Sequence, residues 1–215
     1  DKSVNLILCD LPYGTTACKW DTLLPLKPLW KEYKRIIKDN GVIVLTASQP
    51  FTSALIMSNP NMFREELCWI KNKSGSGLLA NQKHIKVHEE VLVFSKNGRY
   101  TFNPQKWMIE KKQFLTQRKT LSIYGKGNQI YGSMEMNRKK DDGTRNPISV
   151  LAYSVPHNPS KTKKYDKVRN DIREHPTQKP IALFEYLIRT YTNEGDLVLD
   201  NCIGSGTTAI ACKQT

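Results

Sequence analysis

The stretch Val4-Asn5-Leu6-Ile7-Leu8-Cys9, followed by Asp10-Leu11-Pro12-Tyr13-Gly14, decides how the rest of this 215-residue chain is interpreted. Its first six residues are mostly apolar, which is typical of a strand buried on both faces of a parallel sheet. Proline and glycine then end the strand in a turn. Ligands of open α/β sheets bind beyond the carboxyl ends of such strands, so this turn is a candidate site.

The turn combines a carboxylate, a rigid proline and an aromatic ring. The Asp10 carboxylate and the Leu11 carbonyl can each accept a hydrogen bond from an amino group. The Tyr13 ring offers a flat face on which a base can stack, which is worth roughly 1–3 kcal/mol. An ordinary strand-end turn, with Asp10 capping a neighbouring group, is the alternative that the four residues alone leave open.

Hydrophobic spacing extends the pattern in both directions along the chain. Helices are predicted over residues 24–38, 51–57, 179–191 and from 207, and strands over 4–9, 42–46, 63–71, 88–94 and 196–200. The pair Asn40-Gly41 is expected to end the first helix. Alternating strands and helices predict an α/β domain with a mostly parallel sheet.

Positive charge is concentrated in one region. The chain has 33 basic and 20 acidic residues, and residues 96–174 hold 18 of the basic and 7 of the acidic ones. Regular hydrophobic spacing is lost there, which predicts an inserted segment. Such a segment is expected to meet a polyanion, and a solvated basic loop is the alternative.

Two further stretches indicate a ligand site. Gly204-Ser205-Gly206 joins a predicted strand to a helix, and glycines let a backbone approach a ligand closely. The third glycine of the dinucleotide fingerprint and the lysine of a P-loop are missing, which favours a smaller nucleoside-bearing cofactor. In His175-Pro176-Thr177-Gln178-Lys179-Pro180, Thr177 is a candidate helix cap, and Lys179 is a candidate partner of a ligand carboxylate.

Other classes of protein are not indicated. The five cysteines form no C-x-x-C pair and no metal-ligand spacing, which predicts no metal site and a reducing cytosol. Neither a signal peptide nor an apolar run of about 18 residues is present. The chain starts within a predicted core strand and stops within a predicted helix, so truncation at both ends is expected.

Together these stretches resemble the amino-group DNA methyltransferases, which act on N6 of adenine or N4 of cytosine, in the permuted β-type order. In that family an Asp-Pro-Pro-Tyr-like motif comes first, target recognition follows and the cofactor glycine loop comes last. The matching stretches are Asp10 to Tyr13 (DLPY), Cys68 to Lys73, His88 to Phe94, the basic region 96–174, His175 to Pro180 and Asp200 to Gly206.

The resemblance implies a Rossmann-like S-adenosylmethionine-dependent methyltransferase fold, with a mostly parallel sheet and helices on both faces. Residues 1–95 are expected to form the catalytic half and 96–174 a basic, partly flexible target-recognition insertion. Residues 175–215 are expected to form the cofactor-binding half, incomplete because the strand whose acidic residue holds the cofactor ribose would follow Thr215.

The family's chemistry implies a role for each motif residue. Asp10 and the Leu11 carbonyl would accept the two amino hydrogens of a flipped base, with Pro12 shaping the turn and Tyr13 stacking on the base. Cys9 is interpreted as a buried strand residue, and Phe51 as either a cofactor wall or a core aromatic. The residues implied around S-adenosylmethionine are Asp10, Thr177, Lys179, Asp200, Cys202, Gly204, Ser205, Gly206 and Thr207.

The expected partner is double-stranded DNA, with adenine N6 as the target because N4 enzymes more often begin the motif with Ser. Cytosine N4, RNA, a protein glutamine amide and a non-catalytic DNA-binding remnant are the alternatives. A homodimer is left open, and a bacterial or phage-encoded restriction–modification enzyme of the cytoplasm is expected. Candidate DNA contacts are Arg118, Lys119, Arg138, Lys139, Lys140 and Arg145.

Overall fold

The structure, a computed structural model, describes residues 1–74, 77–108, 143–156 and 177–215. The chain divides into two compact units, one of Asp1–Asn103 with Ile148–Thr215 and one of Pro104–Pro147. In the smaller unit, the described residues form an antiparallel ribbon of β5 (Trp107–Met108) and β6 (Thr144–Arg145). The larger unit holds the main sheet and the helices.

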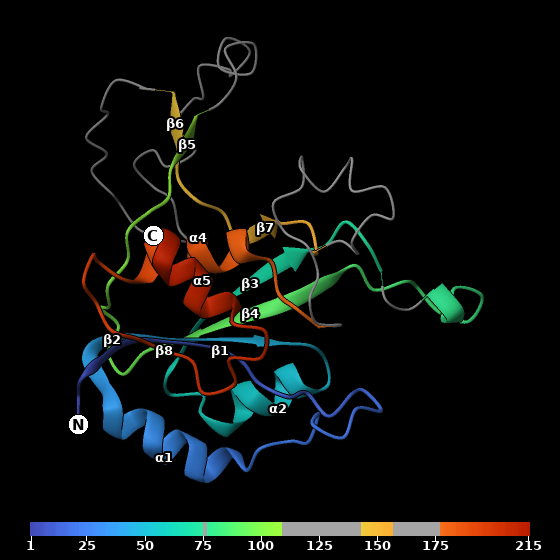
Figure 1. Cartoon of the computed structure of the whole chain (residues 1–215), viewed down its shortest axis with the longest axis horizontal. Helices are drawn as coiled ribbons and strands as arrows, with labels where there is room; N and C mark the ends of the chain where they lie inside the picture. The colour runs from blue at the N-terminus through green and yellow to red at the C-terminus, as the bar shows by residue number, and fades with distance from the viewer. Residues whose placement is uncertain (75–76, 109–142, 157–176) are drawn as a thin grey trace, which may run out of the picture. The chain divides into compact units, whose positions relative to one another are not determined.

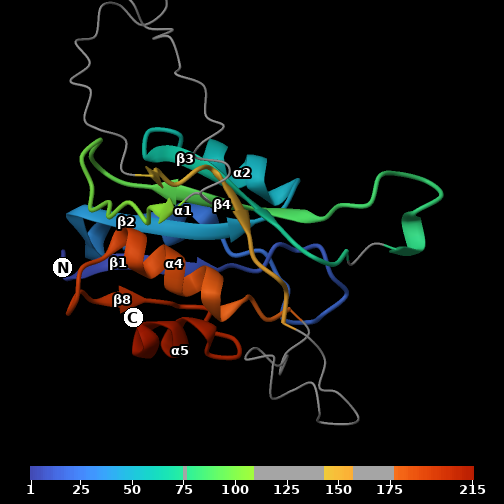
Figure 2. The same ribbon diagram turned by 90° about the horizontal axis from the view of Figure 1, so that it is seen from above.

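A six-stranded sheet forms the centre of the larger unit, in the order β7-β3-β4-β2-β1-β8 (Figures 1 and 2). Only β4 runs against its neighbours, so the other five strands share one direction and the prediction of a mostly parallel sheet is confirmed. Their carboxyl ends lie along one edge, called the carboxyl edge below. The strands are β1 (Val4–Asp10), β2 (Ile37–Ala47), β3 (Phe63–Ile70), β4 (His88–Phe94), β7 (Val150–Ala152) and β8 (Val198–Leu199).

Helices cover both faces of this sheet, as the sequence predicted (Figure 1). One face packs against α1 (Leu26–Ile36) and α2 (Phe51–Ser58), and the other against α4 (Ile181–Tyr191) and α5 (Thr207–Gln214). Successive strand residues point to opposite faces, so Ile7 joins the first core and Leu8 the second. Burying each such side chain contributes about 1.5–3 kcal/mol. In the described part of the chain, no helix is long and apolar enough to cross a membrane.

The first helix ends earlier than the sequence predicted, because strand pairing begins at Ile37. Ile37 pairs with Val4 in the parallel β1–β2 ladder, and its side chain is buried in the core. The predicted stop at Asn40-Gly41 therefore falls inside β2. Gly41 has a different use there, since a Cβ at this position would lie 2.9 Å from the Asn5 carbonyl oxygen.

The two compact units divide the chain at residues other than those of the predicted insertion 96–174, which stays a prediction. The backbone N–H of Asn103 bonds the Thr190 carbonyl oxygen of α4 at 2.7 Å, which keeps the chain with the larger unit beyond residue 95. After the smaller unit, the chain returns to the sheet as β7, which pairs with β3 from Cys68 to Ile70. A three-residue strand has too little hydrophobic pattern to be recognised from sequence.

Candidate active site

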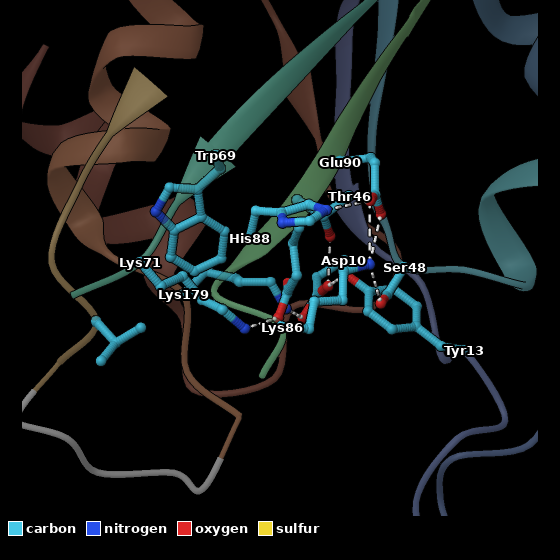
Figure 3. A network of polar contacts seen from close by, with 12 residues as sticks. Asp10, Tyr13, Thr46, Ser48, Trp69, Lys71, Lys86, His88, Glu90 and Lys179 are labelled. Carbon is cyan, nitrogen blue, oxygen red and sulfur yellow. Dashed lines mark hydrogen bonds and ion pairs between the residues drawn. The ribbon is translucent and has the colours of Figure 1, made fainter. Parts of the chain in front are cut away.

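Asp10 ends β1 at the carboxyl edge and is contacted by side chains from three separate parts of the chain (Figure 3). Its Oδ1 accepts hydrogen bonds from the Tyr13 hydroxyl at 2.9 Å and from the hydroxyl of Thr46, the residue opposite it on β2. Its Oδ2 accepts a hydrogen bond from Lys179 Nζ at 2.7 Å. The carboxylate is therefore held in one orientation, with a quarter of the side chain exposed.

Tyr13 lies against Asp10 and Phe51. The Tyr13 and Phe51 rings stack with centroids 5.7 Å apart, and Phe51 is 5% exposed, which places it in the core as one of its two predicted roles. Burial, reinforced by the charges of Asp10 and Glu89, raises the pKa of Tyr13 well above its ordinary value. Tyr13 therefore keeps its proton at neutral pH and remains a hydrogen-bond donor to Asp10.

The glycine loop follows β8, which pairs with β1 in parallel. Asp200 shapes the loop, because its carboxylate accepts the Cys202 backbone N–H at 2.9 Å and the Thr208 hydroxyl at 2.5 Å. Gly204 and Gly206 adopt left-handed backbone angles, with φ of 51° and 84°, which residues with a Cβ rarely adopt. Gly206 is also the N-cap of α5, so the loop opens onto a helix N-terminus.

One cavity of about 1150 Å³ joins these parts. Asp10, Leu11, Pro12 and Tyr13 line one portion of it. The predicted cofactor residues that line it are Thr177, Lys179, Asp200, Cys202, Gly204, Ser205 and Thr207, while Gly206 lies outside the lining. Ligand pockets usually measure about 300–1,000 Å³, so this cavity has room for a nucleoside and a second planar group.

Lys179 lines the cavity and also contacts two carboxylates of the chain itself. Its ammonium contacts the carboxylates of Asp10 and, at 3.6 Å, Glu89. Neighbouring Thr177 does not cap α4, whose N-cap is Pro180 without a side-chain hydrogen bond. The cofactor role of Lys179 therefore stays a prediction, while its contact with the motif aspartate is a finding.

Cys9 is fully buried on β1 beside Cys202, as predicted for a strand residue. The hydrogen bond with the Cys202 thiol and then burial raise the pKa of Cys9, so it stays a protonated thiol. Cys9 is thus a poor nucleophile, because the thiolate is the reactive form.

Two residues of the site, Thr46 and Glu89, were not predicted from the sequence. Thr46 and Glu89 sit in strands, where their side chains are indistinguishable from ordinary strand residues until the register is known. The adjacent acids Glu89 and Glu90 at the start of an apolar strand were the available signal. They point to opposite faces of β4: Glu89 meets Lys71 at 2.7 Å, and buried Glu90 meets Lys86 at 3.0 Å.

Residues 71–87, called the β3–β4 segment below, begin at Lys71 and include Lys86 next to their last residue. This segment contains four lysines, one histidine and no acidic residue. It projects beyond the carboxyl edge in both views (Figures 1 and 2), and Lys73 within it lines the cavity. The charge count of the sequence had pointed only to residues 96–174.

Most of the predicted DNA contacts lie outside the described residues, namely Arg118, Lys119, Arg138, Lys139 and Lys140. Arg145 is described and belongs to β6 of the smaller unit, where its guanidinium donates to the Thr144 carbonyl oxygen at 2.7 Å. Its contact with DNA stays a prediction.

Known proteins resemble this chain over its length. The family model N6_N4_Mtase, described as DNA methylase, matches residues 4–215. Type II methyltransferase M1.MboII of Moraxella bovis is 31% identical over 231 residues, covering 100% of this chain and 82% of that protein. Type II methyltransferase M.HpaI of Haemophilus parainfluenzae is 27% identical over 226 residues, and the match covers 99% of this chain but only 62% of that longer protein. DNA adenine methyltransferase YhdJ of Escherichia coli (strain K12) is 26% identical, covering 96% and 67%.

Solved structures share the fold. The M1.HpyAVI–SAM complex has a TM-score of 0.57 at 23% identity, covering 98% of this chain and 78% of that one. The cytosine-N4-specific PvuII DNA methyltransferase has a TM-score of 0.60 at 15% identity, covering 99% and 72%. At these identities the likeness shows the common architecture.

Proposed function

The chain belongs to the DNA methylase family, and from that premise we propose that it transfers a methyl group from S-adenosylmethionine to N6 of adenine in DNA. The observation that carries the proposal is the single cavity in which Asp10 and the glycine loop meet. The two stretches are about 190 residues apart in the chain, and a shared ligand is the simplest reason for their convergence.

The cavity suits S-adenosylmethionine on two counts. Its volume accommodates a nucleoside cofactor together with a target base. The loop before α5 provides left-handed glycines and the Ser205 hydroxyl, and the first residue of α5 provides the Thr207 hydroxyl. We propose that this loop, with Asp200 and Cys202, holds the nucleoside and that Thr177 lies near the methionine portion. The bound cofactor supplies an electrophilic methyl group.

Asp10 supplies the chemistry on the acceptor side. The lone pair of an exocyclic amine is delocalised into the base, so the amine is a weak nucleophile. A hydrogen bond from the amine to Asp10, and a second to the Leu11 carbonyl, would return electron density to the nitrogen. Leu11 lines the cavity directly after Asp10, which places its backbone beside the carboxylate. Positioning then supplies most of the remaining rate enhancement.

Adenine is favoured over cytosine by the motif itself. The motif begins with Asp10, whereas N4 enzymes of the family more often begin with serine. YhdJ, which matches nearly the whole chain, is named a DNA adenine methyltransferase. The two bases present similar amino groups, so the identity of the product base is the decisive measurement.

DNA must deliver its base to a cavity inside the protein. We propose that the base is flipped from the duplex, at a cost of a few kcal/mol, and that Tyr13 helps to hold it. Phosphate contacts would come from the basic residues between 96 and 174 and from the β3–β4 segment.

Substitution of Asp10 tests the function. Asp10→Ala is expected to lower methyl transfer about 100-fold or more, because it removes the acceptor of an amino hydrogen, while DNA affinity is retained. DNA treated with cofactor and protein is digested to nucleosides, and the methylated base is identified by mass spectrometry. Asp39→Ala, at an exposed carboxylate on β2, serves as the control.

Three outcomes are informative. Near-parental methylation by Asp10→Ala would remove Asp10 from the mechanism. N4-methylcytosine as the product would keep the methyltransferase and correct the base. DNA binding without methylation by the parental protein would favour a non-catalytic remnant.

A further inference from the structure

Lys179 is a buried cation at the centre of the site. Lys179 is 8% exposed. Its ammonium lies 2.7 Å from Asp10 Oδ2 and 3.6 Å from Glu89 Oε2 (Figure 3 shows Lys179 beside Asp10). A lysine is rarely buried so deeply unless carboxylates compensate its charge. The two carboxylates come from β1 and β4, so the lysine joins the motif to a strand on the other side of β2.

Four charges alternate in this chain of contacts: Lys71, Glu89, Lys179 and Asp10. Lys71 Nζ lies 2.7 Å from Glu89 Oε1, and both side chains are less than a fifth exposed. Glu89 Oε2, the oxygen nearer Lys179, is buried and accepts no hydrogen bond from the described residues. Glu89 therefore attracts the Lys179 ammonium by charge alone, and the short hydrogen bond of that ammonium is donated to Asp10.

The hydrogen bonds on Asp10 restrict how an amine can reach it. A carboxylate has about four acceptor positions, two on each oxygen. Oδ1 uses both, for Tyr13 and Thr46, and Oδ2 uses one, for Lys179. Within the described part of the chain one position remains, on the oxygen that Lys179 holds.

We propose that Lys179, held by Glu89, is a positioning residue that orients Asp10 so that the last acceptor position on Oδ2 receives the amino hydrogen of the target base. This inference rests on the proposed function. Lys179 would then act on the target nucleobase through Asp10, and it would not hold the carboxylate of the cofactor.

The ionisation of the chain agrees with this geometry. Burial by itself lowers the pKa of Lys179, but the charges of Asp10 and Glu89 outweigh it and the pKa is raised. Burial opposes ionisation of Glu89, yet Lys179 and Lys71 lower its pKa overall. Both groups are therefore charged at neutral pH, as the contacts require.

The experiment separates catalysis from cofactor binding. Lys179→Met is expected to lower the methylation rate at saturating DNA and cofactor by about 100-fold, the cost of a reacting group misplaced by ~1 Å. Binding of S-adenosylhomocysteine, measured by calorimetry, is expected to stay at the parental affinity. Lys38→Met, which removes a partly buried lysine whose ammonium bonds the Asn5 amide oxygen at 2.9 Å near the start of β2, is the matched control.

Glu89→Gln provides a second test that keeps the side chain's shape. It is expected to lower the rate with unchanged cofactor affinity. Because the two residues act together, the double variant is expected to lose less rate than the two single losses combined, and full additivity would show that they act independently. Should Lys179→Met not fold, as circular dichroism would show, this variant decides.

Two results would overturn the proposal. One is a weaker affinity for S-adenosylhomocysteine in Lys179→Met with a parental rate at saturating cofactor, which would return the lysine to the cofactor site. The other is parental kinetics in both variants. If the parental protein neither methylates DNA nor binds S-adenosylhomocysteine, the proposed function fails as a whole, which distinguishes that failure from this one.

Discussion

The residues that contact Asp10 lie at very different distances from it along the chain. Tyr13 follows three residues later and belongs to the same recognisable motif. Thr46 becomes a neighbour through strand register, and Lys179 through the packing of the segment before α4, 169 residues away. The sequence therefore identified Asp10 and Tyr13 but not Thr46 or Glu89, because a β-branched or acidic residue in a strand has no local signature of its partner.

Glu89 makes a pH-dependent contribution to stability. Its folded pKa is lowered below the ordinary value of 4.5, so this stability is present above pH 4.5 and is lost as the pH falls through the folded pKa. We expect the melting temperature of Glu89→Gln to fall less between about pH 5 and 3 than that of the parental protein. Calorimetric melting across this range is the measurement.

Asp39 offers a control for that comparison. Its pKa is also lowered, mainly by a hydrogen bond to Lys2, but the carboxylate is exposed and screened by solvent. Asp39→Asn should therefore show nearly the same fall in melting temperature between about pH 5 and 3 as the parental protein. If the melting temperature fell equally with pH in the parental protein and in Glu89→Gln, the buried contacts of Glu89 would not contribute to the pH dependence of folding.

Among the elements, the β3–β4 segment combines rigid ends with exposed charge. Lys71 and Lys86 are held at its ends by glutamates on β4, and the Lys86 ammonium also bonds the Ser48 hydroxyl at 3.0 Å. Lys73 and Lys83 are exposed and form no ion pair with the described residues. An acid-free segment with this arrangement is suited to phosphate groups near the cavity.

Neutralising the segment should weaken DNA binding in a salt-dependent way. Each phosphate contact contributes about 0.9 to the slope of log K against log salt, so Lys73→Gln with Lys83→Gln should reduce that slope by up to about 1.8. Fluorescence anisotropy with a labelled duplex at several salt concentrations measures it. Lys27→Gln with Lys31→Gln, on exposed α1, is the control, and an unchanged slope in the segment variant would exclude these contacts.

At the scale of the larger unit, the direction of the strands creates the site. β1 and β8 are parallel neighbours, so the turn after Asp10 and the glycine loop open at the same carboxyl edge. The Thr207 hydroxyl lies 3.4 Å from the Lys179 carbonyl oxygen, which brings the third motif to the same place. Segments from both ends of the chain are thus needed to complete the cavity.

Cofactor binding should therefore stabilise the whole unit. A ligand at 100 times its Kd adds about 2.7 kcal/mol, and a domain of this size gains about 2–4 °C per kcal/mol. S-adenosylhomocysteine at that excess is expected to raise the melting temperature by about 5–10 °C. NAD is the comparison ligand, since the loop lacks the third glycine of the dinucleotide fingerprint. A shift with NAD alone would contradict the cofactor assignment.

The sequence by itself determined the longer helices and strands, the order of the motifs and the family, because apolar periodicity and motif residues are local properties of the chain. It also indicated that the strand Val4 to Cys9 is buried on both faces, which the two cores around Ile7 and Leu8 confirm. Only the tertiary structure decided that β4 runs antiparallel, that β7 completes the sheet and that Lys179 meets Asp10. These features depend on contacts between distant segments, whose free energy is set by packing and charge compensation in the folded state and has no counterpart in local pattern.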